Sequence, residues 1–324
     1  MNHKTFLILA VFIFLFANTN SQSMQWKDVS EYYGPLPATV KLFKTTTPID
    51  DKPNVAFYLT ADIKDKQLSF TADTAKNRRL TPNQFYGKNN QPLVVVNTTF
   101  FSFATNQNLN AVIQNGRLIS YNVHSFPGKG KDTLTYRHTL GSAIGITKNR
   151  MADVAWLFTD SSKKSAYALQ QPVMPPRDSV AYVEMKKRTI KQFNTAGQLK
   201  KWKVETAVGG GPVLVQNNQI AISNNEELKF AGKAIDDKHP RTAMGYTNDH
   251  KLVILVVEGR SPGVAEGASL KQMAAILKEI GCVEALNLDG GGSSAMIVNG
   301  KNTINPSDKT GQRPVPAVFM ISKQ

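Results

Sequence analysis

Residues 269–294 read SLKQMAAILKEIGCVEALNLDGGGSS, and this stretch decides the fold class. Its first half predicts a helix, because Ser269 is a favourable N-cap and apolar residues recur at helical spacing at Leu270, Met273, Leu277 and Ile280. Gly281 is a typical helix stop. The apolar run Val283–Leu288 then predicts a buried strand, which leads into the loop Asp289–Ser294 and a second strand over Ala295–Val298. The chain therefore combines helices with sheets.

The remainder of the chain is rich in strand signals. Apolar runs predict strands over Val55–Leu59 and Leu93–Asn97. Segments joined by turns rich in Asn or Gly predict hairpins, namely Asn110–Ile113 with Arg117–Ser120, Val213–Gln216 with Gln219–Ile222, and Arg241–Thr247 with Leu252–Glu258. We also expect strands over Ser142–Thr147, Val154–Phe158, Val180–Arg188 and Gln198–Glu205, and a helical turn over Thr81–Phe85. No linker divides the chain, so we predict one strand-rich α+β domain with mixed, curved β-sheets and a few packed helices.

The first 21 residues have the pattern of a signal peptide. Lys4 precedes the apolar run Phe6–Ala17, which is too short to cross a bilayer, and small and polar residues follow up to Ser21. We predict cleavage near Ser21 and export to the periplasm or the medium. No cysteine lies at this junction, so the protein is not expected to be a lipoprotein. No later stretch reaches the length of a membrane span.

Composition narrows the classes of partner. The chain of 324 residues carries 39 Lys and Arg against 24 Asp and Glu, a net charge of +15. A basic exported protein suits anionic partners such as phosphate-bearing glycans. Nucleic acid is not expected, because no binding motif for it occurs. The lone Cys282 excludes an intrachain disulfide and is predicted to be a buried packing residue.

The loop at Asp289–Ser294 carries the strongest functional signal. A buried strand delivers Asn287 and Asp289 to one sheet face, two residues apart. The glycines Gly290, Gly291 and Gly292 let backbone N–H groups approach a ligand, and Ser293 and Ser294 add donors. The alternative is a tight strand connection with a capping aspartate.

Two further clusters follow strand ends. Arg241 opens one predicted strand, and Glu258 and Arg260 follow its partner, an arrangement that suits recognition of a phosphate diester. A surface Arg–Glu ion pair is the plain alternative. Asn97 ends an apolar strand and is followed by Phe100 and Phe101, which could pack on a sugar face or be core residues.

Better-known signatures fail in context. Gly290-x-Gly292-x-x-Ala295 fits a dinucleotide fingerprint, but a strand and not a helix follows it. Gly291-x-Ser293-x-Ala295 looks like a nucleophile elbow, yet no histidine follows His250 to complete a triad. The patterns of a penicillin-recognising enzyme fall in polar loops, Lys309-Thr310-Gly311 among them.

Five motifs fall in an order that resembles the phosphodiester glycosidase family, over roughly residues 90–322. They are Asn97-x-x-Phe100-Phe101, Gly209-Gly210-Gly211-Pro212, His239-Pro-Arg241-Thr242, Glu258-Gly-Arg260 and Asn287-Leu-Asp-Gly-Gly-Gly-Ser-Ser294. Thr98-Thr99 stands where the family usually has two glycines, and Glu258 where it has aspartate. The resemblance implies a catalytic domain over residues 91–324, with residues 22–90 as a strand-rich N-terminal extension.

The resemblance also implies a reaction, hydrolysis of the anomeric bond of a sugar-1-phosphodiester, such as an N-acetylglucosamine-1-phosphodiester, to free sugar and a phosphomonoester. Glycosidases normally use two carboxylates, and we assign these to Asp289 and Glu258. Arg241 and Arg260 would bear the phosphate charge. The remaining motif residues, Asn97, Phe100, Gly209, Gly210, Gly211, Thr242, Asn287, Gly290, Gly291, Gly292, Ser293 and Ser294, would bind substrate.

Two alternatives remain open at this point. No cofactor is required, although Asp289, Glu258 and Asn287 offer hard oxygens that suit Ca²⁺, without a calcium-loop spacing. The chain could also be a non-catalytic binding protein for phosphorylated or acidic cell-envelope glycans, using the same residues.

Overall fold

The computed structural model describes residues 23–128, 130, 132–179, 181 and 199–324. The predicted signal peptide lies outside these residues, as does almost all of the strand expected over Val180–Arg188. Apart from these segments, the predicted elements can be compared with the structure directly.

The helix of the 269–294 stretch forms as its sequence predicts. It is α4, Leu270–Ile280, and Ser269 caps it in a reciprocal capping box with Gln272. Gly281 ends it with φ +100°, a left-handed conformation that glycine adopts without strain. Two shorter α-helices are described, α1 (Pro82–Lys88) and α3 (Asn224–Glu227), and two 3-10 turns, η1 (Ser30–Tyr33) and η3 (Gly291–Ser293).

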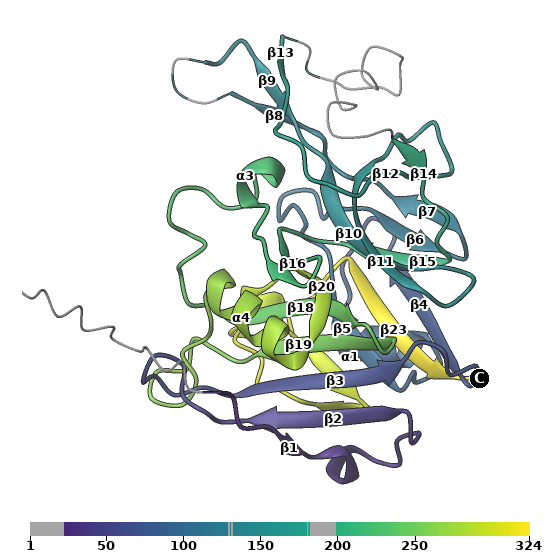
Figure 1. Cartoon of the computed structure of the whole chain (residues 1–324), viewed down its shortest axis with the longest axis vertical. Coiled ribbons are helices and arrows are strands. Elements are labelled where there is room, and N and C mark those ends of the chain that lie inside the picture. Colours follow the sequence, from purple (N-terminus) through teal and green to yellow (C-terminus); the bar gives the residue numbers. More distant parts are fainter. Residues whose placement is uncertain (1–22, 129, 131, 180, 182–198) are drawn as a thin grey trace, which may run out of the picture.

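The largest sheet has eight strands and carries α4 on one face (Figure 1). Apolar residues of α4 pack there against Leu255, Val257 and Ala285. The strands in spatial order are β1 (Lys27–Asp28), β2 (Val40–Thr45), β3 (Ala56–Asp62), β19 (Lys251–Val257), β18 (Arg241–Thr247), β20 (Cys282–Asn287), β16 (Val213–Gln216) and β17 (Gln219–Ile220).

A second sheet of seven strands lies beside the first. Its order is β14 (Lys200–Lys201), β12 (Tyr167–Leu169), β11 (Ala152–Phe158), β10 (Gly141–Ile146), β15 (Thr206–Gly209), β6 (Val112–Gln114) and β7 (Arg117–Ser120). A three-stranded sheet projects from it at the top of Figure 1, formed by β13 (Arg177–Asp178), β9 (Tyr136–His138) and β8 (Ser125–Pro127).

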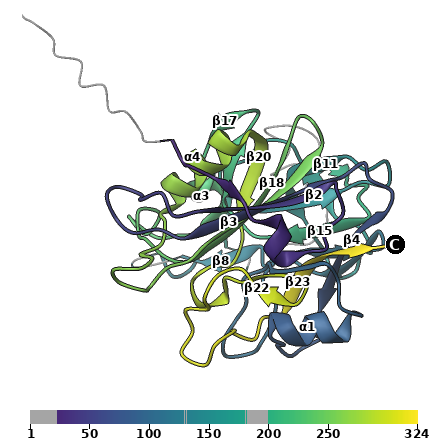
Figure 2. The same cartoon turned by 90° about the horizontal axis from the view of Figure 1, so that it is seen from below.

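The fourth sheet joins the early and late parts of the chain. Its five strands are β22 (Lys301–Asn302), β21 (Met296–Val298), β5 (Val94–Asn97), β23 (Ala317–Lys323) and β4 (Leu68–Thr74). Phe85 of α1 packs on its outer face against Val95 and Ile297. Figure 2 shows α1 and α4 on opposite sides of the molecule.

One large apolar core lies between these sheets. It brings together the inner faces of the eight-stranded sheet (Leu59, Ile254), the five-stranded sheet (Val96, Phe319) and the seven-stranded sheet (Trp156). The α+β fold class is therefore confirmed, with one refinement. Every strand pairing between the described residues is antiparallel, where we expected mixed sheets, because hairpins and sheet-to-sheet crossings connect the strands. Cys282 is fully buried, as predicted.

Registers place three chain segments at one edge of the large sheet. Arg241 opens β18 opposite Val257, the last residue of β19. On the other side of β18, Ala243 pairs with Asn287, the last residue of β20. The residues that follow β19 and β20 therefore flank the start of β18, which brings the motifs at 241–242, 258–260 and 287–294 together.

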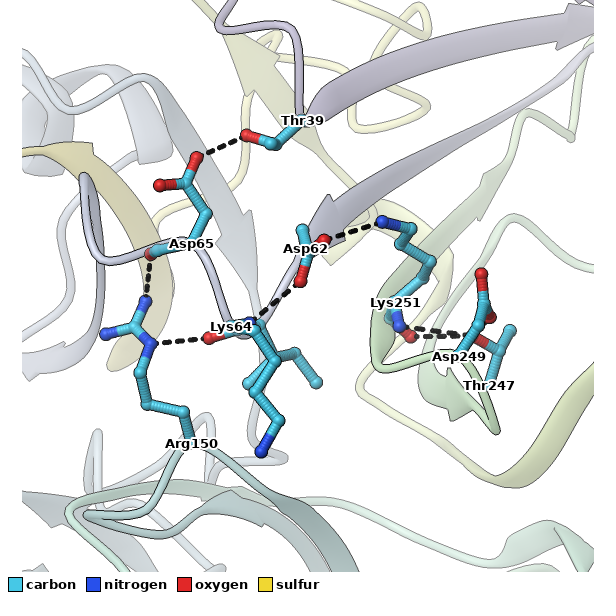
Figure 3. A network of polar contacts seen from close by, with 9 residues as sticks. Thr39, Asp62, Lys64, Asp65, Arg150, Thr247, Asp249 and Lys251 are labelled. Atoms are coloured by element: carbon cyan, nitrogen blue, oxygen red, sulfur yellow. Dashed lines mark hydrogen bonds and ion pairs between the residues drawn. The ribbon is translucent and has the colours of Figure 1, made fainter.

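The opposite end of the same strands is held by a polar network (Figure 3). Arg150, in the turn after β10, donates to the main-chain carbonyls of Ile63, Asp65 and Leu68 in the β3–β4 connection. Asp62 accepts from Lys251 Nζ at 2.8 Å, which ties this connection to the β18–β19 turn. The network fixes the seven-stranded sheet against the eight-stranded sheet. No helix in the described part of the chain is long and apolar enough to cross a membrane.

Ser269→Ala should lower the stability of the protein by about 1 kcal/mol, because it leaves the N–H of Gln272 without the hydroxyl that accepts from it. Thermal unfolding measures this loss. Lys271→Ala on the same helix is the control, since its ion pair with Asp236 is exposed and should contribute little. Equal effects of the two substitutions would contradict the capping role.

Candidate functional site

The site is built where the chain passes from one sheet to another. The N–H of Leu288 still donates to Thr242 O of β18 at 2.8 Å, whereas the N–H of Asp289 donates to Thr98 O, just after β5, at 2.7 Å. Two consecutive residues are thus bonded to different sheets. The Asp289 side chain is held at their junction.

Asn97 secures this junction. Its Nδ2 donates to Asp289 O at 2.6 Å, and its Oδ1 accepts from Thr242 Oγ1 at 2.9 Å and from the N–H of Ala295 at 3.0 Å. Both ends of the amide are engaged within the protein, and Asn97 is fully buried. Asn97 and Thr242, which we expected to bind substrate, lie beside Asp289, and their contacts position it.

Asp289 is the carboxylate that the fold leaves open. Its Oδ2 is buried and has no hydrogen-bond partner among the described residues. Burial raises the pKa of this carboxyl to about 7, while the Ser293 hydroxyl, the Arg313 charge and the Gly290 N–H act in the opposite direction. A carboxyl with a pKa near neutrality can exchange a proton at physiological pH.

Unpartnered polar atoms gather around Asp289. Within the described part of the chain, the buried side-chain atoms without a hydrogen-bond partner include Asn287 Oδ1, Ser293 Oγ, Ser294 Oγ, Thr98 Oγ1 and Thr99 Oγ1. These atoms belong to the two segments that the Asp289–Thr98 hydrogen bond joins. Buried polar groups normally have partners, so this concentration is typical of a ligand site.

The three glycines that follow Asp289 approach three arginines. A Cβ on Gly290 would lie 3.7 Å from Arg241 Cδ, one on Gly291 would lie 3.0 Å from Arg260 Nη2, and one on Gly292 would lie 2.3 Å from Arg313 Nη2. Gly291 also has φ +60°. Gly291 and Gly292 therefore allow a cationic side chain to approach the loop closely, whereas Gly290 gives room for the main-chain oxygen of Pro240. The structure brings the arginines, Asp289 and the glycine loop together.

The arginines differ in how many of their guanidinium donors are already hydrogen-bonded. Arg241 is buried, and its Nε and one terminal nitrogen donate to the carbonyls of Ala268 and Asp237. Burial and the charge of Arg260 lower its pKa to about 10. Arg260 is exposed, and no hydrogen bond or ion pair is found for it among the described residues. Arg241 thus supplies charge from a fixed position, and Arg260 has free donors.

Glu258 follows β19 at the same edge of the large sheet, and its carboxylate is engaged by another loop. Both of its oxygens accept from Asn305, one from the main-chain N–H at 2.9 Å and the other from Nδ2 at 3.1 Å. Its backbone N–H donates to Val55 O. Because β18 separates β19 from β20, the ends that carry Glu258 and Asp289 are about 10 Å apart. The carboxylate positions the 305–313 loop.

The second glycine run, Gly209–Gly211, supports the fold and does not offer its N–H groups to a ligand as we expected. The N–H groups of Gly209, Gly210 and Gly211 donate to Ala111 O, Ser142 O and Asn287 O, so none of them is left to bind an oxygen of a ligand. A Cβ on Gly211 would lie 2.2 Å from Glu227 Oε2. These glycines give room for the buried Glu227. In the other loop, the N–H groups of Gly291, Ser293 and Ser294 are likewise bonded internally.

Glu227 is a site-supporting residue that the sequence analysis missed. Its carboxylate is buried and accepts from the Ser142 N–H and hydroxyl, the Ser223 hydroxyl, the Val213 N–H and Trp156 Nε1. Lys229 lies beside it, with Nζ 5.3 Å from the Phe100 ring centroid. Phe100 is partly buried and packs edge-on against Phe230, so it borders the site without being a core residue.

The second missed residue is Arg313. It pairs with Asp308 at 2.6 Å in the loop after β22, which carries no strand signal. We expected only a polar loop at 306–314. The third glycine, Gly292, indicates that something approaches the loop, since a tight turn needs fewer than three glycines. Nothing in the sequence identifies that group as Arg313.

No group of three His, Cys, Asp or Glu side chains converges within the described ranges. The set Asp289, Glu258 and Asn287, considered above for Ca²⁺, is not assembled, because Glu258 is engaged by Asn305.

Residues 165–322 match the sequence profile of the phosphodiester glycosidase family. The N-acetylglucosamine-1-phosphodiester alpha-N-acetylglucosaminidase of Mus musculus is 29% identical over 102 residues, 31% of this chain and 19% of that enzyme. The Bos taurus enzyme of the same name is 31% identical over 102 residues, again 31% of this chain and 19% of that enzyme. Over the matched stretch, just under half of its length, the chain resembles the phosphodiester glycosidase family.

A bacterial relative is shorter in its match but more similar. The SPbeta prophage-derived uncharacterized protein YomE of Bacillus subtilis is 45% identical over 71 residues, 22% of this chain and 11% of that protein. The chain spans no more than about a fifth of the length of these relatives.

Solved structures agree on the fold. The catalytic domain of the zebrafish N-acetylglucosamine-1-phosphodiester alpha-N-acetylglucosaminidase, auto-inhibited by its pro-peptide, matches with a TM-score of 0.57 at 19% identity, over 93% of this chain and 89% of that one. A hypothetical protein from Synechocystis matches with a TM-score of 0.57 at 16% identity, over 88% and 62%. The chain therefore shares its fold with proteins of very different sequence.

Asp289→Asn should stabilise the protein at pH 8. The folded-state pKa of about 7 lies above the unfolded value of 3.8, so ionising the buried carboxyl lowers stability as pH rises from about 4 to 7. We expect a melting temperature higher by roughly 2–6 °C at pH 8, with the difference shrinking towards pH 4. Scanning fluorimetry across this range measures it. A variant that melts lower than the parent at pH 8 would show that the ionised Asp289 carboxylate does not destabilise the folded protein.

Proposed function

We propose that the protein is an exported hydrolase that cleaves the anomeric C–O bond of a sugar-1-phosphodiester, releasing free sugar and a phosphomonoester. The observation that carries this proposal is the unpartnered, buried Oδ2 of Asp289 beside a glycine loop that faces three arginines. Similarity to the phosphodiester glycosidase family supports the reaction class, and the pattern of residues 1–21 supports export. Residues 91–324 would form the catalytic domain.

The phosphate would be bound on the arginine side of the loop. Arg260 has free guanidinium donors next to Gly291, and Arg313 lies next to Gly292. Planar guanidinium groups bind phosphate oxygens in pairs, and they stabilise the negative charge that collects on a phosphate leaving group. Arg241 adds a fixed positive charge from behind the loop. Asn287 Oδ1 would accept from a sugar hydroxyl, and the hydroxyls of Ser293, Ser294, Thr98 and Thr99 would bind sugar or phosphate oxygens.

Asp289 would act as the base that activates water. Water attacks the anomeric carbon while Asp289 takes its proton, and the bond from the anomeric carbon to the phosphate oxygen breaks with its electron pair going to the phosphomonoester. The leaving group is already anionic and needs no strong acid. Direct attack of water on the face opposite the leaving phosphate, with no covalent intermediate, predicts inversion at the anomeric carbon.

Asp289→Asn should abolish turnover of methyl phospho-N-acetylglucosamine, lowering kcat by at least about a hundredfold, because general-base help is lost. Chromatography of the products identifies the broken bond, and NMR of fresh product identifies the anomer. Glu258→Gln is the matched control, because it also removes a carboxyl. Any effect it has should come from a less stable 305–313 loop. Sugar 1-phosphate as product would refute anomeric cleavage. Binding without turnover in the parent protein would favour the glycan-binding alternative.

The pH profile provides a separate test. Since Asp289 must be ionised to accept a proton, kcat/KM should rise about tenfold per pH unit below pH 7 and level off above it. Steady-state rates between pH 5 and 9 measure this profile. An activity that falls as pH rises through 7 would instead make Asp289 the proton donor.

A further inference from the structure

A ledge of two arginines and an exposed phenylalanine adjoins the site beyond Gly292. The Phe103 ring is 64% exposed and lies between two guanidinium groups, Arg313 at 5.3 Å and Arg79 at 5.4 Å from its centroid. Arg79 also contacts the Phe101 ring at 5.0 Å. No carboxylate pairs with Arg79 among the described residues, so the donor edge of its guanidinium is available to an anion.

A polar groove of about 390 Å³ lies near this ledge, because Phe101, which Arg79 contacts, pairs with Asn108 of the groove lining. The same three chain segments build both features. Arg79 of the ledge follows Arg78 and Lys76 of the groove, Phe103 lies in the loop that brings Asn108 to the groove, and Arg313 lies three residues before Pro316 in its wall. The groove is therefore built from the same chain segments as the phosphate side of the candidate site.

The groove has the chemistry of an anionic glycan site. Lys76 and Arg78 are exposed cations with no acidic side chain among the residues that line it. Amide groups of Asn77, Asn106, Gln107 and Asn108 supply donors and acceptors for hydroxyls. Asn108 Nδ2 is buried and has no partner in the described part of the chain, whereas its Oδ1 accepts from the N–H of Asn110. The ring of Phe103 offers an apolar face for a sugar.

We propose that the natural substrate is an oligomeric glycan with repeated phosphodiesters, and that the groove binds a second phosphate and sugar of its aglycone. This rests on the proposed function. The phosphate next to the cleaved bond would lie at Arg260 and Arg313, the following sugar would pack on Phe103, and the next phosphate would pair with Arg79, Arg78 and Lys76. The net charge of +15 favours such a polyanion from a distance.

The test compares substrates of one and several phosphates. The probes are methyl phospho-N-acetylglucosamine and a tetramer of N-acetylglucosamine units joined by 1,6-phosphodiesters. We expect kcat/KM per bond to be about tenfold higher for the tetramer, an advantage of about 1.4 kcal/mol. Lys76→Ala/Arg78→Ala should remove most of this advantage and leave the methyl substrate within twofold. Raising NaCl from 50 to 500 mM should also reduce it.

Lys66→Ala/Lys148→Ala is the control, because it removes the same charge from two exposed turns at the other end of the strands. An equal loss of kcat/KM on both substrates, or the same loss in the control variant, would overturn the proposed role of the groove. Equal competition by polyglutamate and by the tetramer would show a general polyanion surface and would also overturn it.

Failure of the proposed function is distinguishable from failure of the groove. If the parent protein cleaves neither probe, calorimetric titration of Asp289→Asn with the tetramer still measures binding. Affinity that depends on Lys76 and Arg78 would then support the groove, and absence of binding would refute it.

Discussion

Two neighbouring backbone N–H groups, those of Leu288 and Asp289, donate to carbonyls of different sheets, and the rest of the site depends on this crossing. The chain leaves the eight-stranded sheet at Leu288 and is held by the 97–98 segment of the five-stranded sheet one residue later. A side chain at such a junction has protein on both sides. It is therefore desolvated without being part of either apolar core, and this is the condition under which a carboxyl keeps its proton to unusually high pH.

Everything around the junction fixes the position of the loop and leaves its functional atoms free. Asn97 uses both ends of its amide, Glu258 is engaged by Asn305, and Glu227 accepts from several donors beneath Gly211. By contrast, Asp289 Oδ2, Asn287 Oδ1 and the hydroxyls around them lack partners in the described residues. Catalytic sites generally need such a division, in which supporting residues are fully bonded and reacting groups are not.

The sequence predicted the parts of the site that are local. The helix at Ser269, the strand before Asn287 and the hairpins around Gly116 and Asn217 follow from caps, periodicity and turn residues. The pairing of β4 with β23 was not predicted, because it joins segments nearly 250 residues apart and no local pattern encodes a partner. Arg313, Asn305 and Glu227 were missed for the same reason. Their roles depend on where distant contacts place a loop or a short helix. We expected Glu258 and the Gly209–Gly211 amides to contact substrate because they follow strand ends, whereas the structure engages them within the protein.

The glycine triplet also limits how this chain can diverge. Gly291 and Gly292 face different arginines and Gly290 faces Pro240 O, so a side chain at any of the three would displace a guanidinium or meet main chain. The buried hydroxyls of Thr98 and Thr99 belong to the segment bonded to this loop and have no hydrogen-bond partner among the described residues. The surface loop around Phe103 has few constraints of its own. New sugar preferences are therefore expected to evolve through those threonines and that loop, with the catalytic loop unchanged.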